Sequence, residues 1–118
     1  MKKGIIVLVT LTLFIAGIQN LYAYTYTYNN RVPYLIKVIL EVYNGEDRTN
    51  QIEPNGSYDF STDLLLKSWR AEVFLDNQWQ QILHLTCDFL PGNHSFSIHV
   101  DETRDQRGTV TRNWYTTN

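Results

Sequence analysis

Apolar residues recur at every second position through most of this chain. In the runs 34–42 and 69–75, residues of one parity are apolar, while charged or polar residues interrupt the other parity. Alternation of about 180° per residue puts one set of side chains on one face of a strand, whereas a helix needs a period of about 3.6 residues. The runs are also rich in β-branched and aromatic residues, which suit a half-buried pleated surface. The pattern predicts an all-β chain.

Turn-forming residues divide this pattern into about seven strands. The turns are expected at Asn44-Gly45, Asn55-Gly56, Asp76-Asn77 and Gly92-Asn93. Short connections favour antiparallel pairing, because a parallel crossover needs about a dozen residues or more. We therefore predict a small antiparallel β-sandwich, immunoglobulin-like or similar, with a small barrel as the alternative. The segment 62–68 is compatible with one or two helical turns or with a buried loop, and the charged segment 101–108 indicates a solvated loop.

The first 23 residues differ from the rest of the chain. Lys2 and Lys3 precede an uncharged apolar run over 4–18, and Ala23 fits the position before a cleavage site. These are the parts of a bacterial-style secretory signal peptide. We predict a signal peptide at 1–23 and one domain at 24–118, exported to the periplasm or outside the cell. An uncleaved membrane anchor is the alternative, although a spanning helix needs about 20 apolar residues.

Charge and length exclude several classes of protein. Lys2 and Lys3 leave with the leader, so the 10 Lys and Arg of the full chain become 8, against 12 Asp and Glu. A negative domain has no electrostatic reason to bind nucleic acid or anionic lipid. After cleavage no apolar stretch is long enough to span a membrane, and the length suits one domain rather than a multidomain enzyme.

The sequence contains one thiol, Cys87, on the expected inward face of the run 79–87. That face is predicted to carry Trp79, Gln81, Leu83 and Leu85 as well. A buried Cys acts as a small hydrophobic residue. The alternative is an exposed Cys87 that forms an intermolecular disulfide in an oxidising compartment.

Neither a catalytic motif nor a metal motif is present. His84 and His99 are expected on the outward faces of two strands that pair as a hairpin, but zinc needs three or four ligands. Asp101, Glu102 and Asp105 form a loose acidic group without the spacing of a calcium loop. We therefore predict no catalytic residue, no metal ligand and no cofactor.

Aromatic residues are the most unusual part of the composition, at 14% of the chain. We take two groups near the ends of the domain as candidate binding residues. They are Tyr24, Tyr26, Tyr28, Trp114 and Tyr115. The rings either bury in the core, or they form a surface that docks on a protein partner or stacks on sugar rings. A terminal strand of this kind can also add to the sheet edge of another subunit.

Taken together, these features predict a small exported β-sandwich that is not an enzyme and that acts by binding a protein or carbohydrate partner. The first alternative is a self-assembling surface or structural subunit that forms homo-oligomers through its terminal strands. The second alternative is a small secreted hydrolase or metal-dependent enzyme.

Overall fold

The computed structural model describes residues 24–90 and 92–118, and in this part of the chain it contains strands and no helix. The strands are β1 (Tyr24–Asn30), β2 (Ile36–Val42), β3 (Arg48–Ile52), β4 (Ser57–Thr62), β5 (Leu66–Leu75), β6 (Gln78–Leu90), β7 (His94–Arg104) and β8 (Val110–Thr117). The all-β prediction is confirmed, with eight strands rather than about seven. The expected signal peptide at 1–23 lies outside the described residues. No helix that could cross a membrane is found in the described part.

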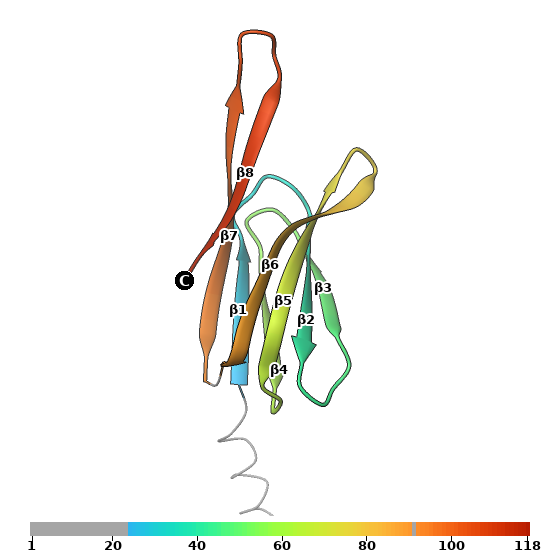
Figure 1. Cartoon of the computed structure of the whole chain (residues 1–118), viewed down its shortest axis with the longest axis vertical. Helices are drawn as coiled ribbons and strands as arrows, with labels where there is room; N and C mark the ends of the chain where they lie inside the picture. The colour runs from blue at the N-terminus through green and yellow to red at the C-terminus, as the bar shows by residue number, and fades with distance from the viewer. Residues whose placement is uncertain (1–23, 91) are drawn as a thin grey trace, which may run out of the picture.

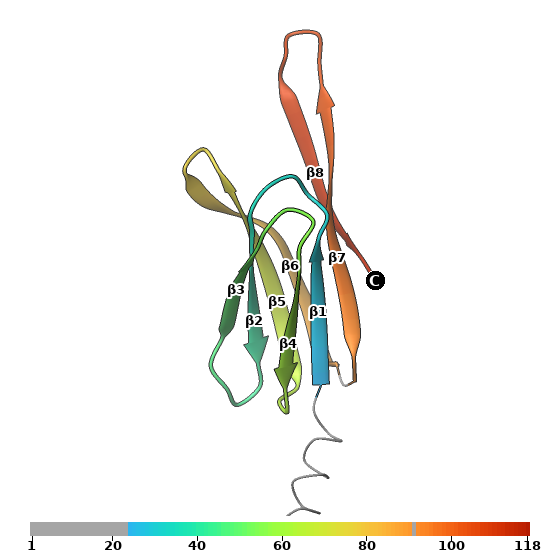
Figure 2. The same ribbon diagram turned by 180° about the vertical axis from the view of Figure 1, so that it is seen from behind.

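Two four-stranded sheets pack face to face in a sandwich-like arrangement (Figures 1 and 2). One sheet has the order β4-β1-β7-β8 and is called sheet A here. The other has the order β3-β2-β5-β6 and is called sheet B. Each two-strand hairpin, such as β5–β6 or β7–β8, stays within one sheet, and the remaining connections cross between the sheets.

The central position of β1 departs from the prediction of an antiparallel sandwich. β1 pairs with β4 in the antiparallel sense but with β7 in the parallel sense, with Tyr28 opposite Phe96. Short connections force antiparallel pairing only between strands that are close in sequence, and β1 and β7 stand at opposite ends of the domain. The prediction of a purely antiparallel fold is therefore wrong at this pair.

Two segments predicted to lie outside strands lie partly in strands. Thr62 ends β4 and Leu66 begins β5, so only 63–65 connect these strands, and this connection contains no helical turn. The first four residues of 101–108 continue β7 as far as Arg104. Cross-strand pairing with β8 supplies the order that the charged composition of this segment does not indicate, since Glu102 lies opposite Arg112.

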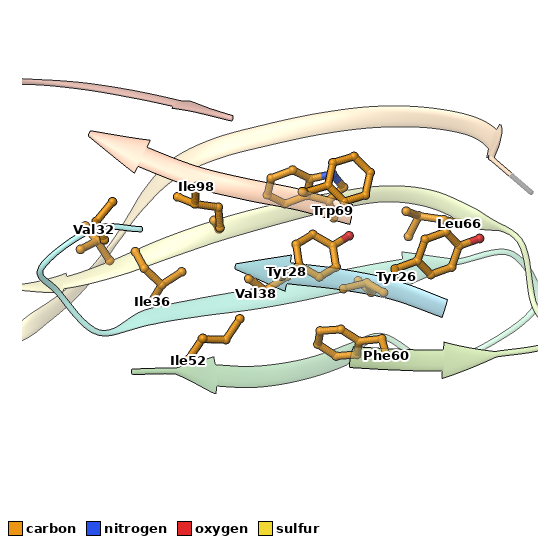
Figure 3. Packing of buried hydrophobic residues seen from close by; sticks show 14 of the residues in the cluster. Tyr26, Tyr28, Val32, Ile36, Val38, Ile52, Phe60, Leu66, Trp69 and Ile98 are labelled. Atoms are coloured by element: carbon orange, nitrogen blue, oxygen red, sulfur yellow. The ribbon is translucent and has the colours of Figure 1, made fainter. Parts of the chain in front are cut away.

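The core lies between the sheets and is built around Trp69 (Figure 3). Its ring contacts Tyr28 at 5.0 Å and Phe96 at 5.4 Å between ring centroids. Alternate residues on β2 and β5 complete the core from sheet B, as the alternation predicts. They are Ile36, Val38, Leu40, Val42, Ala71 and Val73. Leu66 joins them from the other parity of β5, before the register shift near Ser68.

A buried asparagine closes one end of the core. The Asn30 side chain is fully buried and donates from Nδ2 to the backbone oxygens of Tyr34, at 2.8 Å, and Ile52, at 2.9 Å. Its Oδ1 accepts a hydrogen bond from the backbone N–H of Val32 at 2.9 Å. Asn30 therefore ties the end of β1 and the β1–β2 loop to the end of β3.

The buried hydroxyl of Tyr28 makes the stability of the fold depend on pH in the alkaline range. Burial, with smaller contributions from Cys87 and Tyr26, raises the pKa of Tyr28 well above its ordinary value. The unfolded chain ionises this phenol near pH 10 while the folded chain keeps it protonated. Below about pH 9 we expect the contribution of Tyr28 to the free energy of unfolding to be constant. Above about pH 10 we expect this free energy to fall by about 1.4 kcal/mol per pH unit.

Tyr28→Phe tests this expectation by urea unfolding at pH 7 and at pH 11. Among the described residues the Tyr28 hydroxyl has no hydrogen-bond partner, so its removal is expected to keep or raise stability at pH 7. At pH 11 the free energy of unfolding of the variant is expected to exceed that of the wild type by about 1.4 kcal/mol more than at pH 7. An equal difference at both pH values would contradict the expectation.

Candidate functional site

The predicted binding residues on β1 are largely core residues. The side chains of Tyr26 and Tyr28 are both fully buried, and Tyr24 is half-buried. Both edges of β1 are also hydrogen-bonded, to β4 on one side and to β7 on the other. We therefore withdraw Tyr26 and Tyr28 from the candidate binding surface, and β1 cannot add to the sheet of another subunit. Their alternation with Thr25 and Thr27 marks the buried face of β1.

The predicted residues Trp114 and Tyr115 lie on opposite faces of β8. β7 and β8 form a hairpin, called the arm here, that extends beyond the other strands (Figure 1). On the outer face Tyr115 stacks on His99, with 5.0 Å between ring centroids. On the inner face Trp114 contacts Tyr34 of the β1–β2 loop at 6.2 Å between ring centroids. The two aromatic residues therefore belong to two different surfaces.

The inner face of the arm is anchored by a polar cluster. The Tyr34 hydroxyl donates a hydrogen bond to Oε1 of Glu102, and Arg112 Nε lies 3.5 Å from the same oxygen. The Arg112 guanidinium also lies 5.5 Å from the centre of the Tyr34 ring. The side chain of Tyr34, more than the charge of Glu102, raises the pKa of Arg112 above its ordinary value. The cluster holds the arm against the β1–β2 loop.

The acidic residues of the arm do not come together as a cation site. Glu102 faces the inner cluster, whereas Asp101 lies at the next position, opposite Asn113. The Oδ1 atom of Asp105 accepts hydrogen bonds from the backbone N–H groups of Arg107 and Thr109, both at 2.9 Å. Across the described ranges 24–90 and 92–118, no group of three or more metal-ligating residues is found.

His84 and His99 lie in different sheets. His84 is on β6 of sheet B, where it faces Arg70, and His99 is on β7 of sheet A. The hairpin predicted between their strands is therefore wrong, because the chain crosses from one sheet to the other between β6 and β7. His99 instead hydrogen-bonds through Nε2 with Oγ1 of Thr117 at 2.9 Å.

Sheet B carries an aromatic surface that the sequence analysis did not single out. Phe74 and Trp79 lie opposite each other at the end of the β5–β6 hairpin, with 5.2 Å between ring centroids. We call this pair the aromatic shelf. Phe74 is 40% exposed, which is high for a ring of this size. The two residues Asp76 and Asn77 form the hairpin turn with φ of 53° and 59°, and this turn sets the pairing of Phe74 with Trp79.

A β-bulge explains why the face of Trp79 was assigned wrongly. Glu72 pairs with Gln81, but the preceding residue Ala71 pairs with Leu83, so Ile82 is an extra residue in β6. One extra residue reverses the face of everything beyond it. Leu83, Leu85 and Cys87 therefore pack against the core, while Trp79 joins Phe74 on the outside. The two-residue turn is the signal that predicts this pairing, because it places 74 opposite 79.

A row of polar side chains runs across sheet B next to the aromatic shelf. Gln51, Lys37, Glu72 and Gln81 are successive cross-strand partners on β3, β2, β5 and β6. The Nζ atom of Lys37 lies 3.5 Å from Oε1 of Glu72 and 4.1 Å from the centre of the Trp79 ring. The polar row and the aromatic shelf therefore form one continuous surface in which Lys37 is held on two sides.

Cys87 lies half-buried on the core side of β6. Its Sγ atom is 4.0 Å from the backbone oxygen of Leu85. This position fits the prediction of a small inward-facing hydrophobic residue better than an exposed thiol.

Comparison with known proteins identifies no family. No protein-family model and no curated protein matches the chain. Among solved structures, the chain is similar to an NMR structure of a protein from Eubacterium rectale, with 16% sequence identity and a TM-score of 0.47. That similarity covers 77% of this chain and 86% of the other protein. The function proposed below is based on the residues and geometry of the chain itself.

Proposed function

We propose that this chain is an exported, non-catalytic binding protein that holds a neutral polysaccharide on the outer face of sheet B. The observation that carries the proposal is the continuity of the aromatic shelf with the polar row. Pyranose rings combine apolar C–H faces with hydroxyl groups at their rims. A binding site for them therefore needs exposed aromatic rings beside fixed donors and acceptors, and this surface supplies both.

The charges on this surface favour an uncharged ligand. Lys37 and Glu72 form an ion pair, and the flanking residues Gln51 and Gln81 are neutral. Because the two charges offset each other, this surface itself gives neither an anionic nor a cationic polymer a net attraction. The carboxylate of Glu72 and the amides of both glutamines remain able to hydrogen-bond to sugar hydroxyls.

The predicted leader at 1–23 supports a role outside the cytoplasm. An exported bacterial-style protein meets polysaccharides in the periplasm, at the cell envelope or outside the cell. The immunoglobulin-like assignment forms no part of this proposal, because β1 and β2 lie in opposite sheets whereas the first two immunoglobulin strands share one. The sequence analysis left a protein partner open beside a carbohydrate, and the test below distinguishes the two.

Trp79→Ala is expected to weaken polysaccharide binding at least tenfold, equivalent to about 1.4 kcal/mol. Phe74→Ala is expected to act in the same direction, since either change removes half of the aromatic shelf. The measurement is native affinity electrophoresis through gels that each contain one neutral polysaccharide, namely hydroxyethylcellulose, xylan, mannan or laminarin. Retarded migration of the wild type reports binding, and heparin serves as the anionic comparison.

Tyr115→Ala is the matched control, because Tyr115 is also 40% exposed but lies on the outer face of sheet A. Relative to a gel without polysaccharide, it is expected to be retarded as strongly as the wild type in every gel. The proposal fails if the wild type is not retarded by any of the neutral polymers, or if Trp79→Ala and Phe74→Ala are retarded as strongly as the wild type. Capture of an envelope protein that depends on Trp79, without retardation in any gel, would favour the protein partner.

A further inference from the structure

The outer edge of β8 is an unprotected sheet edge. β8 pairs with β7 through eight consecutive positions without a register shift, and no described strand pairs with its other side. Its sequence, VTRNWYTT, contains no Pro, Lys, Asp or Glu. Natural proteins protect the edges of their sheets with prolines, charges, bulges or short strands. β8 has none of these except Arg112, whose side chain is held on the inner face by Tyr34 and Glu102.

The other three edge strands of the described sheets differ from β8. The outer edge of β4 is partly blocked, because Nη1 of Arg48 donates a hydrogen bond to the backbone oxygen of Ser61 at 2.9 Å. β3 is short, with five residues. β6 is interrupted by the bulge at Ile82. Beyond Ile98 the side of β7 that faces away from β8 is unpaired as well, but this part of β7 carries the charged residues Asp101, Glu102 and Arg104. The protection of these edges and the openness of β8 point to a partner for β8.

We propose that β8 pairs with β8 of a second copy of this chain. The two strands run antiparallel about a two-fold axis at Asn113, and the two copies of sheet A become one continuous sheet of eight strands. Such a dimer satisfies both open edges with one type of contact, as a two-fold interface requires. This inference is independent of the proposed polysaccharide site, which is on the other sheet.

The side chains of β8 complement each other in this register. Arg112 faces Trp114 of the partner subunit, which allows the guanidinium to contact the face of the indole. Thr111 faces Tyr115 of the partner subunit, an aromatic and β-branched pair of the kind that stabilises sheets. Arg112 is the one charged residue of β8, so no like charges meet. An axis at Trp114 instead places Arg112 opposite Thr116 and loses the contact with the indole.

The test uses the protein purified after expression with its own leader. Sedimentation equilibrium across a hundredfold concentration range is expected to show a dimer for the wild type. Asn113→Lys places two lysines against each other on the axis, and we expect it to weaken dimerisation at least tenfold. Asn113 is exposed, so this variant is expected to keep the circular dichroism spectrum and melting temperature of the wild-type monomer.

Disulfide trapping tests the register. Residues that face each other across antiparallel strands have Cα atoms about 4.5 to 5.5 Å apart, which is within the range of a disulfide. In a Cys87→Ser background, Asn113→Cys is expected to form a covalent dimer on mild oxidation. Thr103→Cys, also exposed but on β7 and one strand away from the outer edge of β8, is expected to stay monomeric on a denaturing gel. A wild type that remains monomeric throughout, or a dimer that Asn113→Lys leaves unchanged and Asn113→Cys does not trap, would overturn the proposal.

Discussion

Asn30→Ala is expected to lower the free energy of unfolding by about 3 kcal/mol or more, among the largest effects of any single substitution in this chain. Asn30 is fully buried, and its amide serves three backbone groups, those of Val32, Tyr34 and Ile52. Alanine leaves these groups without their hydrogen bonds, and each buried group left unpaired costs about 1 to 3 kcal/mol. Urea denaturation at pH 7 measures the change.

Asn29→Ala is the matched control for this prediction. Asn29 is the neighbouring residue on β1, but its half-buried side chain lies on the outer face of the sheet. There it hydrogen-bonds with the hydroxyls of Ser57, Ser95 and Ser97 and with the backbone oxygen of Phe96. Because water replaces such partners at the surface, we expect a loss of about 1 kcal/mol or less. Asn30→Asp is expected to be at least as damaging as alanine, since a carboxylate cannot donate to the two backbone oxygens. A loss below about 1 kcal/mol for Asn30→Ala would show that the loop reorganises.

The core was the part of the structure most accessible to prediction from the sequence. Alternation over 34–42 and 69–75 identifies Ile36, Val38, Trp69 and Val73 as inward residues, and all four are fully buried. Alternation depends only on the geometry of a single strand. It is therefore independent of which strands become neighbours, and it holds even though the parallel pairing of β1 with β7 was not expected.

Features that depend on two strands at once were less accessible. The bulge at Ile82 is invisible in the apolar pattern of β6, because Ile82 is as apolar as its neighbours Leu83 and Leu85. Only the partner strand β5 reveals that one residue is extra. The exposed aromatic shelf was missed for the same reason. Similarly, the opposite placement of His84 and His99 follows from a crossover between sheets, which the turn residues around Gly92 do not distinguish from a hairpin.

The candidate binding residues also depend on which strands become neighbours. The aromatic excess predicted that some rings serve binding, but composition does not say which rings are buried. Tyr28 is in the core, since its face of β1 packs on Trp69. Trp114 and Tyr115 are on an edge strand, where a sequence without protective charges is informative once the strand order is known. The sequence therefore indicates the type of residue at a site, and the sheet order determines which of them reach the surface.

Trp69→Ala is expected to destabilise the fold by about 3 to 5 kcal/mol, because it opens a cavity between the two sheets. Domains of this size are stable by only about 5 to 15 kcal/mol, so the variant is expected to melt at least about 12 °C below the wild type. Trp69 is fully buried and touches both Tyr28 and Phe96 across the interface between the sheets.

The three tryptophans together separate stability from function. Trp79 stands on the surface of sheet B and Trp114 is half-buried on the arm, so we expect each alanine variant to lose only about 1 to 2 kcal/mol of stability. Trp79→Ala is expected to lose polysaccharide retardation while keeping the dimer, and Trp114→Ala to weaken the dimer while keeping retardation. Differential scanning calorimetry, affinity electrophoresis and sedimentation of the same three proteins provide the measurements. Equal destabilisation by all three substitutions would contradict the separation, because it would place Trp79 and Trp114 in the core with Trp69.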